Sequence, residues 1–496
     1  MKKILLPATL ILAVSQLLSR ILGVLRDSTF AHVFGATGGV GIFNLDTYFA
    51  AFRLPDLVYS LLIFGTLSAA FIPLIAEKKT EAEVNRFASN TLNVLFIFVL
   101  IFCGILFVFA KPFIHLITPG FDAEATTQTA LLLRIQLLAP IFFTISAVMG
   151  GLAQHFHKFV WYSLAPILYN AGIIFGALVW GREYGVVGLS YGVALGSFLH
   201  AVIQIPGMFR AGFRWQPVFR LRELRSLLRL AIPRVVAVTA SQLQFIAVTF
   251  FASLIGGGAL AVFNYAYNLA SLPLGVVGVA FATVSFAGLT RLVGKPKEFG
   301  EALRKNILGV LYWVIPSAIG LFVLRVEITQ LILARGEFTA TDVKLVADSL
   351  AYLAVGIPCF SLLPILNNAF FAKKNTRIPL LANIFCLGVT ILAAYLLSPR
   401  FASAGLAAAY SLAAVVSIVY LFVLLRRSTD FALGKTFWKI ILVSAALGIL
   451  AWWLHQAFAA GSFLELILKV GGIAAIGGGF YLASLKFLGV NPRKLG

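Results

Sequence analysis

The sequence predicts an all-α polytopic membrane protein with about 14 transmembrane helices, and three observations lead to this class. Hydrophobic residues make up 60% of the 496 residues, whereas charged residues make up only 11%. The mean hydropathy is +0.98, while a typical soluble chain has about a quarter of its residues charged. The apolar residues also form runs of about 20 or more, the length that a helix needs to cross a bilayer.

Charged or Gly/Pro-rich breaks divide these runs into the predicted spans. They cover residues 5–34, 43–76, 87–110, 125–153, 159–180, 185–209, 227–255, 259–290, 305–324, 345–372, 378–397, 402–425, 437–458 and 463–487. The first run follows Lys2 and Lys3, but no small-residue cleavage site precedes a polar region. We therefore expect it to remain as the first span rather than to act as a cleaved signal peptide.

Basic residues gather in alternate loops of this arrangement. Most of the 39 Lys and Arg lie around residues 78–86, 210–229, 291–305, 373–377 and 426–439, and the intervening loops contain few. Because Lys and Arg accumulate on the cytoplasmic side, both termini are predicted to be cytoplasmic. Topology and attraction to anionic membrane lipids account for the net charge of +21, so no nucleic-acid partner is expected.

The chain contains two similar halves in the same order. Gly120 and Gly336 lie 216 positions apart, as do Lys158 and Lys374. Such an offset indicates a parallel repeat of two six-helix lobes, as in transporters built around a central cavity, although similar composition of apolar helices is an alternative explanation. The predicted parts are an N-terminal lobe over 1–210, a basic cytoplasmic linker over 211–230, a C-terminal lobe over 231–427 and two further helices over 428–496.

Three arginines lie inside the first two spans: Arg20, Arg26 and Arg53. A charge at the bilayer centre costs roughly 2.5–3.5 kcal/mol on insertion scales, and such residues usually face a bundle interior or an aqueous cavity. Guanidinium groups stay ionised and donate two parallel hydrogen bonds to phosphate. The pattern therefore predicts a cavity that binds an anionic, phosphate-bearing substrate.

Carboxylates accompany these arginines. Asp27, Asp46 and Asp56 are candidates for setting the charge of the cavity, but they could also form ion pairs that only hold helices together. Arg134 in the fourth span is a further candidate, or its side chain extends to the membrane interface.

Pro55 and Pro273 fall inside predicted spans and are candidate hinges, since proline removes a backbone donor and kinks a helix. His155 and His157 are two apart with no Cys or carboxylate beside them, so a surface role fits them better than a metal site. No nucleotide-binding loop or nucleophile motif is present. The sequence therefore predicts a transporter rather than an enzyme, with no cofactor.

Three motifs stand in the first two spans. They are Ser19-Arg20-x-Leu22-Gly23-x-x-Arg26-Asp27, Asp46-x-x-Phe49-x-Ala51-Phe52-Arg53-Leu54-Pro55-Asp56 and Gly65-x-x-Ser68-x-Ala70-Phe71-x-Pro73. Together they resemble the MurJ/MviN lipid II flippases, which belong to the multidrug/oligosaccharidyl-lipid/polysaccharide transporter superfamily. The resemblance implies two six-helix lobes around a V-shaped cavity and two extra helices lining a groove for a lipid tail.

The resemblance also implies a function in peptidoglycan synthesis at the bacterial inner membrane. Lipid II, an undecaprenyl-pyrophosphate-linked disaccharide pentapeptide, would move from the inner to the outer leaflet by alternating access, and cell-wall synthesis proteins are candidate partners. Carried over by position, Arg20, Arg26 and Arg53 would engage the pyrophosphate. Asp27 and Asp46 would orient these arginines or help to switch the cavity.

The chain departs from the family pattern at Tyr59, Ser60 and Asn268, where many relatives have basic residues. A flippase for another polyprenyl-linked glycan and a drug antiporter of the same superfamily remain alternatives, although a cationic-drug cavity would favour carboxylates. A membrane scaffold without transport activity is the third alternative.

Overall fold

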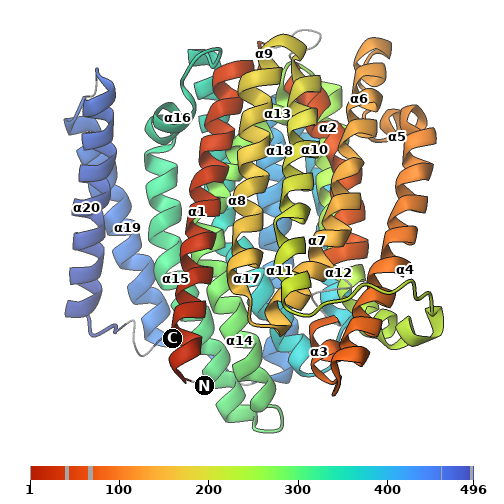
Figure 1. The fold of residues 1–496 in the computed structure, drawn as a ribbon. Helices are drawn as coiled ribbons and strands as arrows, with labels where there is room; N and C mark the ends of the chain where they lie inside the picture. The colour runs from red at the N-terminus through yellow and green to blue at the C-terminus, as the bar shows by residue number, and fades with distance from the viewer. Residues whose placement is uncertain are drawn as a thin grey trace. The chain divides into compact units, whose positions relative to one another are not determined.

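The computed structural model describes residues 2–38, 44–64, 71–429, 431–459, 461–491 and 495. Over these residues all regular structure is helical, which confirms the all-α class (Figure 1). Nine helices in these residues are long and apolar enough to cross a membrane, and the full number of about 14 spans stays a prediction. Motif residues Gly65, Ser68 and Ala70 lie outside the described residues.

The chain forms two compact units. The first contains Met1–Leu260 with Arg335–Phe338, and the second contains Ala261–Ala334 with Thr339–Gly496. The helix that begins the predicted C-terminal lobe groups with the first unit, while the division into lobes at residues 211–230 stays a prediction.

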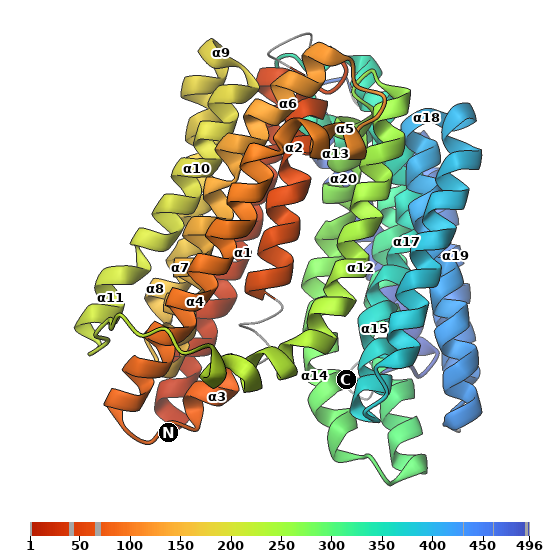
Figure 2. The ribbon, with the colours of Figure 1, turned by 90° about the vertical axis from the view of Figure 1, so that its right-hand side faces the viewer.

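The first unit contains the whole predicted N-terminal lobe, the linker and one further long helix. Its elements are α1 (Lys2–Phe34), α2 (Leu45–Val58), the π-helix η2 (Tyr59–Phe64), α3 (Ile72–Ala76), α4 (Glu81–Val108), α5 (Ala110–Ile117), α6 (Ala123–Gln136), α7 (Leu138–His155), α8 (Phe159–Phe175), the π-helix η4 (Gly176–Trp180), α9 (Gly181–Tyr184), α10 (Val186–Val202), α11 (Gln204–Arg210), the 3-10 helix η5 (Leu221–Leu224) and α12 (Arg225–Ile255). The views in Figures 1 and 2 show α1, α7, α8 and α10 running side by side.

The second unit consists of fewer and longer elements. They are α13 (Ala259–Pro273), the π-helix η6 (Leu274–Gly278), α14 (Val279–Arg291), α15 (Pro296–Val323), α16 (Arg325–Leu333), α17 (Ala340–Ala372), α18 (Arg377–Ser428), α19 (Gly434–Ala457) and α20 (Phe463–Phe487). The predicted spans 378–397 and 402–425 are two helices that meet in α18 at a kink, where Ala402 has φ 47° and ψ −130°. Helices α17 and α18 pack side by side, as Figure 2 shows.

Local signals explain where several helices begin. Helices α4, α17 and α20 each start with a capping box, in which a Ser or Thr and the acidic residue three positions later satisfy backbone N–H groups reciprocally. Both predicted hinge prolines precede a change of helix type. Pro55 lies one turn before η2, and Pro273 is immediately followed by η6. At both prolines the backbone leaves regular α-helical geometry, as expected at a kink.

Backbone features recur at one offset in the two halves. Helix α7 ends with a hydrogen bond from Lys158 N to Ala153 O, and α17 ends with the same bond from Asn375 N to Phe370 O, 217 positions later. These are 6→1 bonds of the kind that close a Schellman motif. The unusual backbone of Ala402 matches Gly185, with φ 61° and ψ −138°, again 217 positions earlier. This recurrence supports the duplication. The backbone features give an offset of 217 positions between the halves, one more than the offset of 216 between Lys158 and Lys374.

Gly120 and Gly336, the pair that first indicated the repeat, meet backbone at equivalent places. A Cβ on Gly120 would collide with the backbone of Ser253 near the end of α12. A Cβ on Gly336, which has φ +57°, would collide with the backbone of His32 near the end of α1. Both contacts lie inside the first unit. Glycine is therefore required at both positions because the chains approach too closely for a side chain.

Hydrogen bonds attach the first part of the basic linker to α4. Residues 212–220 lie along α4, where four polar side chains bind their backbone: Asn85, Ser89, Asn90 and Asn93. These four positions share one face of α4. Their hydrogen bonds take the place of secondary-structure partners for the extended segment, which Figure 1 shows running from α11 towards α4.

Candidate functional site

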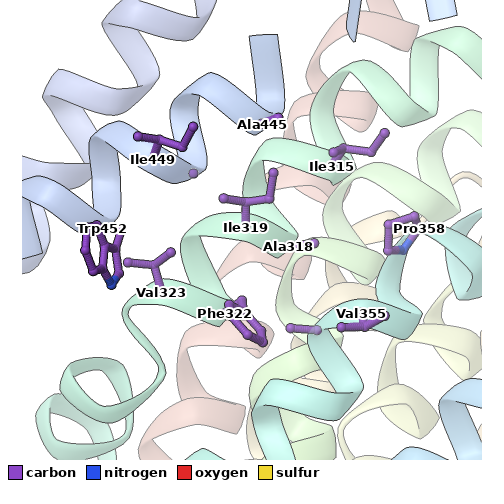
Figure 3. A pocket seen from close by; sticks show the side chains of 12 residues that line it. Ile315, Ala318, Ile319, Phe322, Val323, Val355, Pro358, Ala445, Ile449 and Trp452 are labelled. Atoms are coloured by element: carbon purple, nitrogen blue, oxygen red, sulfur yellow. The ribbon is translucent and has the colours of Figure 1, made fainter. Parts of the chain in front are cut away.

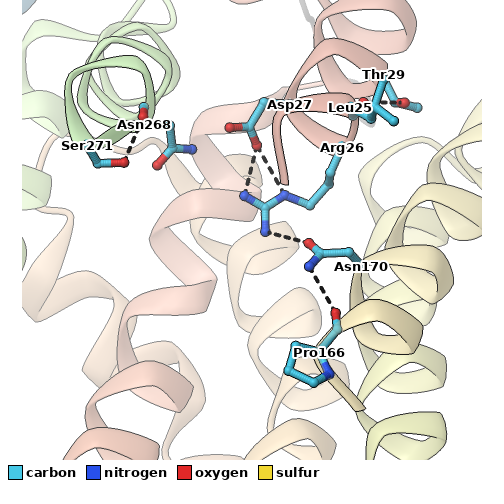
Figure 4. A network of polar contacts seen from close by, with 8 residues as sticks. All are labelled: Leu25, Arg26, Asp27, Thr29, Pro166, Asn170, Asn268 and Ser271. Carbon is cyan, nitrogen blue, oxygen red and sulfur yellow. Dashed lines mark hydrogen bonds and ion pairs between the residues drawn. The ribbon is translucent and has the colours of Figure 1, made fainter. Parts of the chain in front are cut away.

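The first polar cluster lies between α1 and α8. Arg26 donates to Asp27 Oδ1 through Nε at 3.1 Å and through Nη2 at 2.9 Å, and its Nη1 donates to Asn170 Oδ1 at 3.4 Å (Figure 4). Asn170 in turn donates to Pro166 O at 3.0 Å. This second bond fixes the amide so that its oxygen faces the arginine.

The second cluster lies between α2 and α12. Arg53 Nε donates to Thr249 Oγ1 at 3.0 Å, and its guanidinium lies over the Phe245 ring at 5.1 Å from the centroid. Asp56, one turn after Arg53, accepts a hydrogen bond from Gln242, which also donates to Ser60 Oγ at 2.6 Å. Residues 242, 245 and 249 follow helical spacing, so one face of α12 carries all three contacts.

Aromatic side chains lie between the two clusters. Tyr169, next to Asn170 on α8, is close enough to both Arg26 and Asp56 for electrostatic interaction. Tyr48 on α2 interacts with Arg26 in the same way and packs edge-on against Phe30, with ring centroids 5.7 Å apart. The two clusters therefore belong to one site in the first unit.

The other predicted residues occupy further positions on the helices of the first unit. Asp46 is buried in the first turn of α2, where Asn44 caps the helix and the helix dipole favours a negative charge. Arg20 is half-buried on α1. Arg134 donates to Phe107 O at 3.1 Å near the end of α4, where a cation interacts favourably with the helix dipole. The geometry of Arg134 fits the interfacial alternative better than a cavity role.

The departures from the family pattern occupy structured positions. Tyr59 begins η2, and its ring packs on Phe143 at 5.0 Å between centroids. Ser60 is the hydroxyl that accepts from Gln242. In the second unit, the backbone carbonyl of Asn268 accepts from Ser271 Oγ at 2.7 Å. A neutral side chain thus stands at each of the three positions.

Sequence reasoning missed the neutral residues of the two clusters: Asn170, Thr249, Gln242, Phe245 and Tyr169. The signal that could have found Asn170 is a single amide within an apolar run, and for Gln242 it is the polar sequence Ser241-Gln242-Leu243-Gln244 inside a predicted span. For Thr249 and the two aromatic residues no such signal exists, because they are ordinary residues of transmembrane helices.

An apolar pocket of about 530 Å³ lies in the second unit, among α15, α17 and α19 (Figure 3). Its wall includes Ile319 and Phe322 from α15, Val355 from α17, and Ile449 and Trp452 from α19. Of the two C-terminal helices, α19 contributes to this wall, and α20 contributes none of the lining residues. The pocket offers hydrocarbon contacts to an apolar chain.

Metal chemistry has no candidate site in the described part of the chain, where no group of three or more His, Cys, Asp or Glu side chains could hold an ion. His155 ends α7 and packs edge-on against the Phe156 ring. What the first unit offers instead is oriented guanidinium groups, which bind anions.

Comparison with known proteins agrees with these features. The family model described as lipid II flippase MurJ matches residues 30–471. A probable lipid II flippase MurJ of Rhizobium tropici is 31% identical over 87% of this chain and 83% of its own. The corresponding protein of Vibrio cholerae is 28% identical over 99% of this chain and 98% of its own.

Solved structures share the fold. A structure titled lipid II flippase MurJ, inward closed conformation, has a TM-score of 0.81 at 24% identity and covers 97% of this chain and 98% of its own. An inward-facing multidrug resistance transporter of the MATE family has a TM-score of 0.64 at 17% identity, covering 82% of this chain and 95% of its own. With the family model matching most of its length, the chain belongs to the MurJ family of lipid II flippases.

Proposed function

We propose that this protein moves lipid II from the inner to the outer leaflet of the bacterial inner membrane by alternating access, with Arg20, Arg26 and Arg53 engaging the pyrophosphate. The observation that carries the proposal is that Arg26 and Arg53 are held in fixed orientations inside apolar helices. Arg26 is oriented by the carboxylate of Asp27 and the amide of Asn170. Arg53 is oriented by the hydroxyl of Thr249 and the ring of Phe245.

Orientation matters because phosphate recognition by arginine is directional. The planar guanidinium matches two phosphate oxygens with two parallel N–H bonds, and it stays ionised in a poorly hydrated site. A long side chain that rotates freely loses conformational entropy when it binds the anion, and this loss weakens binding. A guanidinium that neighbouring helices already orient avoids part of that cost.

Asp27 has a natural place in this mechanism. It accepts from the Nε and Nη2 side of Arg26, which is one of the edges that can bind two anion oxygens. A pyrophosphate that uses this edge must displace the carboxylate. Asp27 would then exchange partners as the substrate enters and leaves, which is how it would help to switch the cavity. Asp46 and Asp56 would act through the charge of the site.

The shape changes of alternating access require places where helices bend. Pro55 and Pro273, each followed by a π-helical turn, would serve as these hinges. The apolar pocket among α15, α17 and α19 would hold part of the polyprenyl tail. Both termini would lie in the cytoplasm, and cell-wall synthesis proteins on the outer face would receive the substrate.

The test measures exposure of lipid II on the outer leaflet of bacteria depleted of their own flippase and expressing this chain. Arg53→Lys keeps the charge but loses the planar fork, and Arg182→Lys, a change in the exposed helix α9, is the matched control. We expect the parent and the control to restore exposure and Arg53→Lys to reduce it. A membrane-inserted parent that restores no exposure would refute the proposed function, in favour of another lipid-linked glycan or of a scaffold.

A further inference from the structure

A buried group of charges joins three elements of the second unit. Glu327 in the first turn of α16 is 6% exposed. Its Oε1 accepts from Lys469 Nζ on α20 at 2.8 Å and lies 2.5 Å from His455 Nε2 on α19. The proposed transport mechanism uses none of these residues.

The charges are costly where they stand. Lys469 lies in the second turn of an apolar helix, and its side chain is only 9% exposed. Buried ion pairs contribute little net stability, because desolvation offsets most of the attraction, whereas removal of one partner leaves an uncompensated charge. An apolar pair would pack α20 as well, so a role in fixing the position of the helix explains the charges better than stability does.

Helix α20 needs such positioning because it packs sparsely. Only 17% of its most apolar stretch is buried, the smallest share among the candidate spans found in the described residues. At the end that carries the charges, its contacts with α15, α16 and α19 are a small apolar group that includes Leu324, Leu454 and Ile473. Figure 1 shows α19 and α20 as a hairpin beside α15 and α16.

The charged group also stands just beyond one end of the apolar pocket. Phe322 and Val323 line the pocket from the last turn of α15, and Glu327 follows Val323 by four residues. Trp452 lines it from α19, and His455 is one turn further on (Figure 3). The contact between Glu327 on α16 and His455 on α19 thus lies about one helical turn past the pocket residues of α15 and α19.

We propose that Glu327, His455 and Lys469 form an ionic clasp that holds the α19–α20 hairpin on α15 and α16 and so sets the width of the apolar pocket at that end. The three are positioning residues, since they act through the pocket wall. The link to transport rests on the proposed function, in which this pocket holds the lipid tail. The effect of the clasp on the position of the hairpin does not depend on the proposed function.

Distances between spin labels in proteoliposomes test the clasp directly. Labels would be placed at the exposed positions Val326 on α16 and Leu464 on α20, after replacement of the native cysteines. We expect one narrow distance distribution in the parent and a broader one in Lys469→Met. The exchange of Glu327→Lys with Lys469→Glu should restore the narrow distribution, which also controls for misfolding.

Lys439→Met is the matched control, because Lys439 binds the backbone carbonyl of Leu488 at the other end of the same hairpin. It should leave the distribution narrow. A distribution of parental width in both Lys469→Met and Glu327→Gln would overturn the clasp.

A second readout tests the pocket width. Flipping of lipid II with its undecaprenyl tail should fall several-fold in Lys469→Met, whereas a farnesyl analogue, too short to depend on the pocket, should flip at the parental rate. Equal loss for both substrates would overturn the link to the pocket. A parent that flips neither substrate would refute the proposed function, while the label distances would still decide the clasp.

Discussion

Thr249 offers the sharpest test of whether orientation of Arg53 matters. Its hydroxyl donates to Phe245 O at 2.9 Å and accepts from Arg53 Nε at 3.0 Å, and the residue is fully buried. The bond to the carbonyl uses the hydroxyl hydrogen, so a lone pair is left facing the guanidinium. Thr249→Val keeps the shape of the side chain and removes this acceptor together with the bond to Phe245 O.

The expected loss follows from the charge on the donor. A hydrogen bond that involves a charged group contributes about 1.5–3 kcal/mol, and each 1.4 kcal/mol is a factor of about ten. If the orientation of Arg53 is needed while lipid II crosses, Thr249→Val should slow flipping by roughly ten- to a hundred-fold. Thr249→Ser retains the hydroxyl and should flip at nearly the parental rate.

The assay is the flipping rate of fluorescent lipid II in proteoliposomes at matched protein content. Thr91→Val is the control for the lost backbone bond, since buried Thr91 donates to Phe87 O at 2.8 Å in the same way but contacts no arginine within the contacts described for it. Equal rates for Thr249→Val, Thr249→Ser and Thr91→Val would show that the Arg53 bond has no part in transport.

Three further predictions concern the backbone, the linker and the clasp. Ala402→Gly should raise the thermal unfolding temperature, because Ala402 adopts a backbone conformation that Gly185 supplies in the first half and such strain costs about 1–3 kcal/mol; an unchanged or lower temperature would contradict the strain. Asn93→Ala removes three hydrogen bonds to the linker, so limited trypsin treatment should cut faster after Arg214, and a parental cleavage rate would show that the linker is held by other contacts. For Glu327, burial raises the pKa of the carboxyl, but the hydrogen bond from the lysine on α20 and the nearby histidine outweigh burial and hold the pKa below 4.5. A carboxyl whose pKa is lower in the folded than in the unfolded protein stabilises the fold at a pH above the unfolded pKa, and this stabilisation is lost as the pH falls through the folded pKa. The label distances should therefore stay narrow down to about pH 4.5 and broaden below it. Broadening between pH 7 and 5 would contradict a lowered pKa.

The helices could be predicted because hydropathy reports on the membrane directly. A run of apolar residues has few alternatives in a bilayer, so spans such as 87–110 and 463–487 correspond to α4 and α20. Breaks inside spans were harder to predict. The predicted span 125–153 is divided at Leu137 into α6 and α7, since nothing in an apolar sequence marks a short irregularity that neighbouring helices stabilise.

The site could be predicted only as a set of charges. Arg26 and Arg53 are conspicuous because charge is rare in a span, but Asn170 lies 144 positions from Arg26 and Thr249 lies 196 from Arg53. Such partners depend on which helices pack together, which the sequence does not state. The same limit hid Glu327 and Lys469, which are 142 positions apart. Lys469, a charge inside the last apolar run, was a signal that a partner must exist.

The unequal halves of this duplicated chain match the unequal halves of its proposed substrate. Lipid II joins a doubly charged pyrophosphate and a sugar headgroup to a long hydrocarbon tail, and no single environment suits both ends. The first unit carries oriented arginines on α1 and α2, whereas α13, which corresponds to α2 in the second unit, contains no charged residue. The second unit in turn has the apolar pocket and its charged clasp. A transporter of small cationic drugs needs neither anion-binding arginines nor a pocket for a hydrocarbon tail, whereas a transporter of an amphiphilic anion needs both. Flipping by variants of the first unit should therefore depend on the headgroup of the substrate, and flipping by variants of the clasp should depend on the length of its tail.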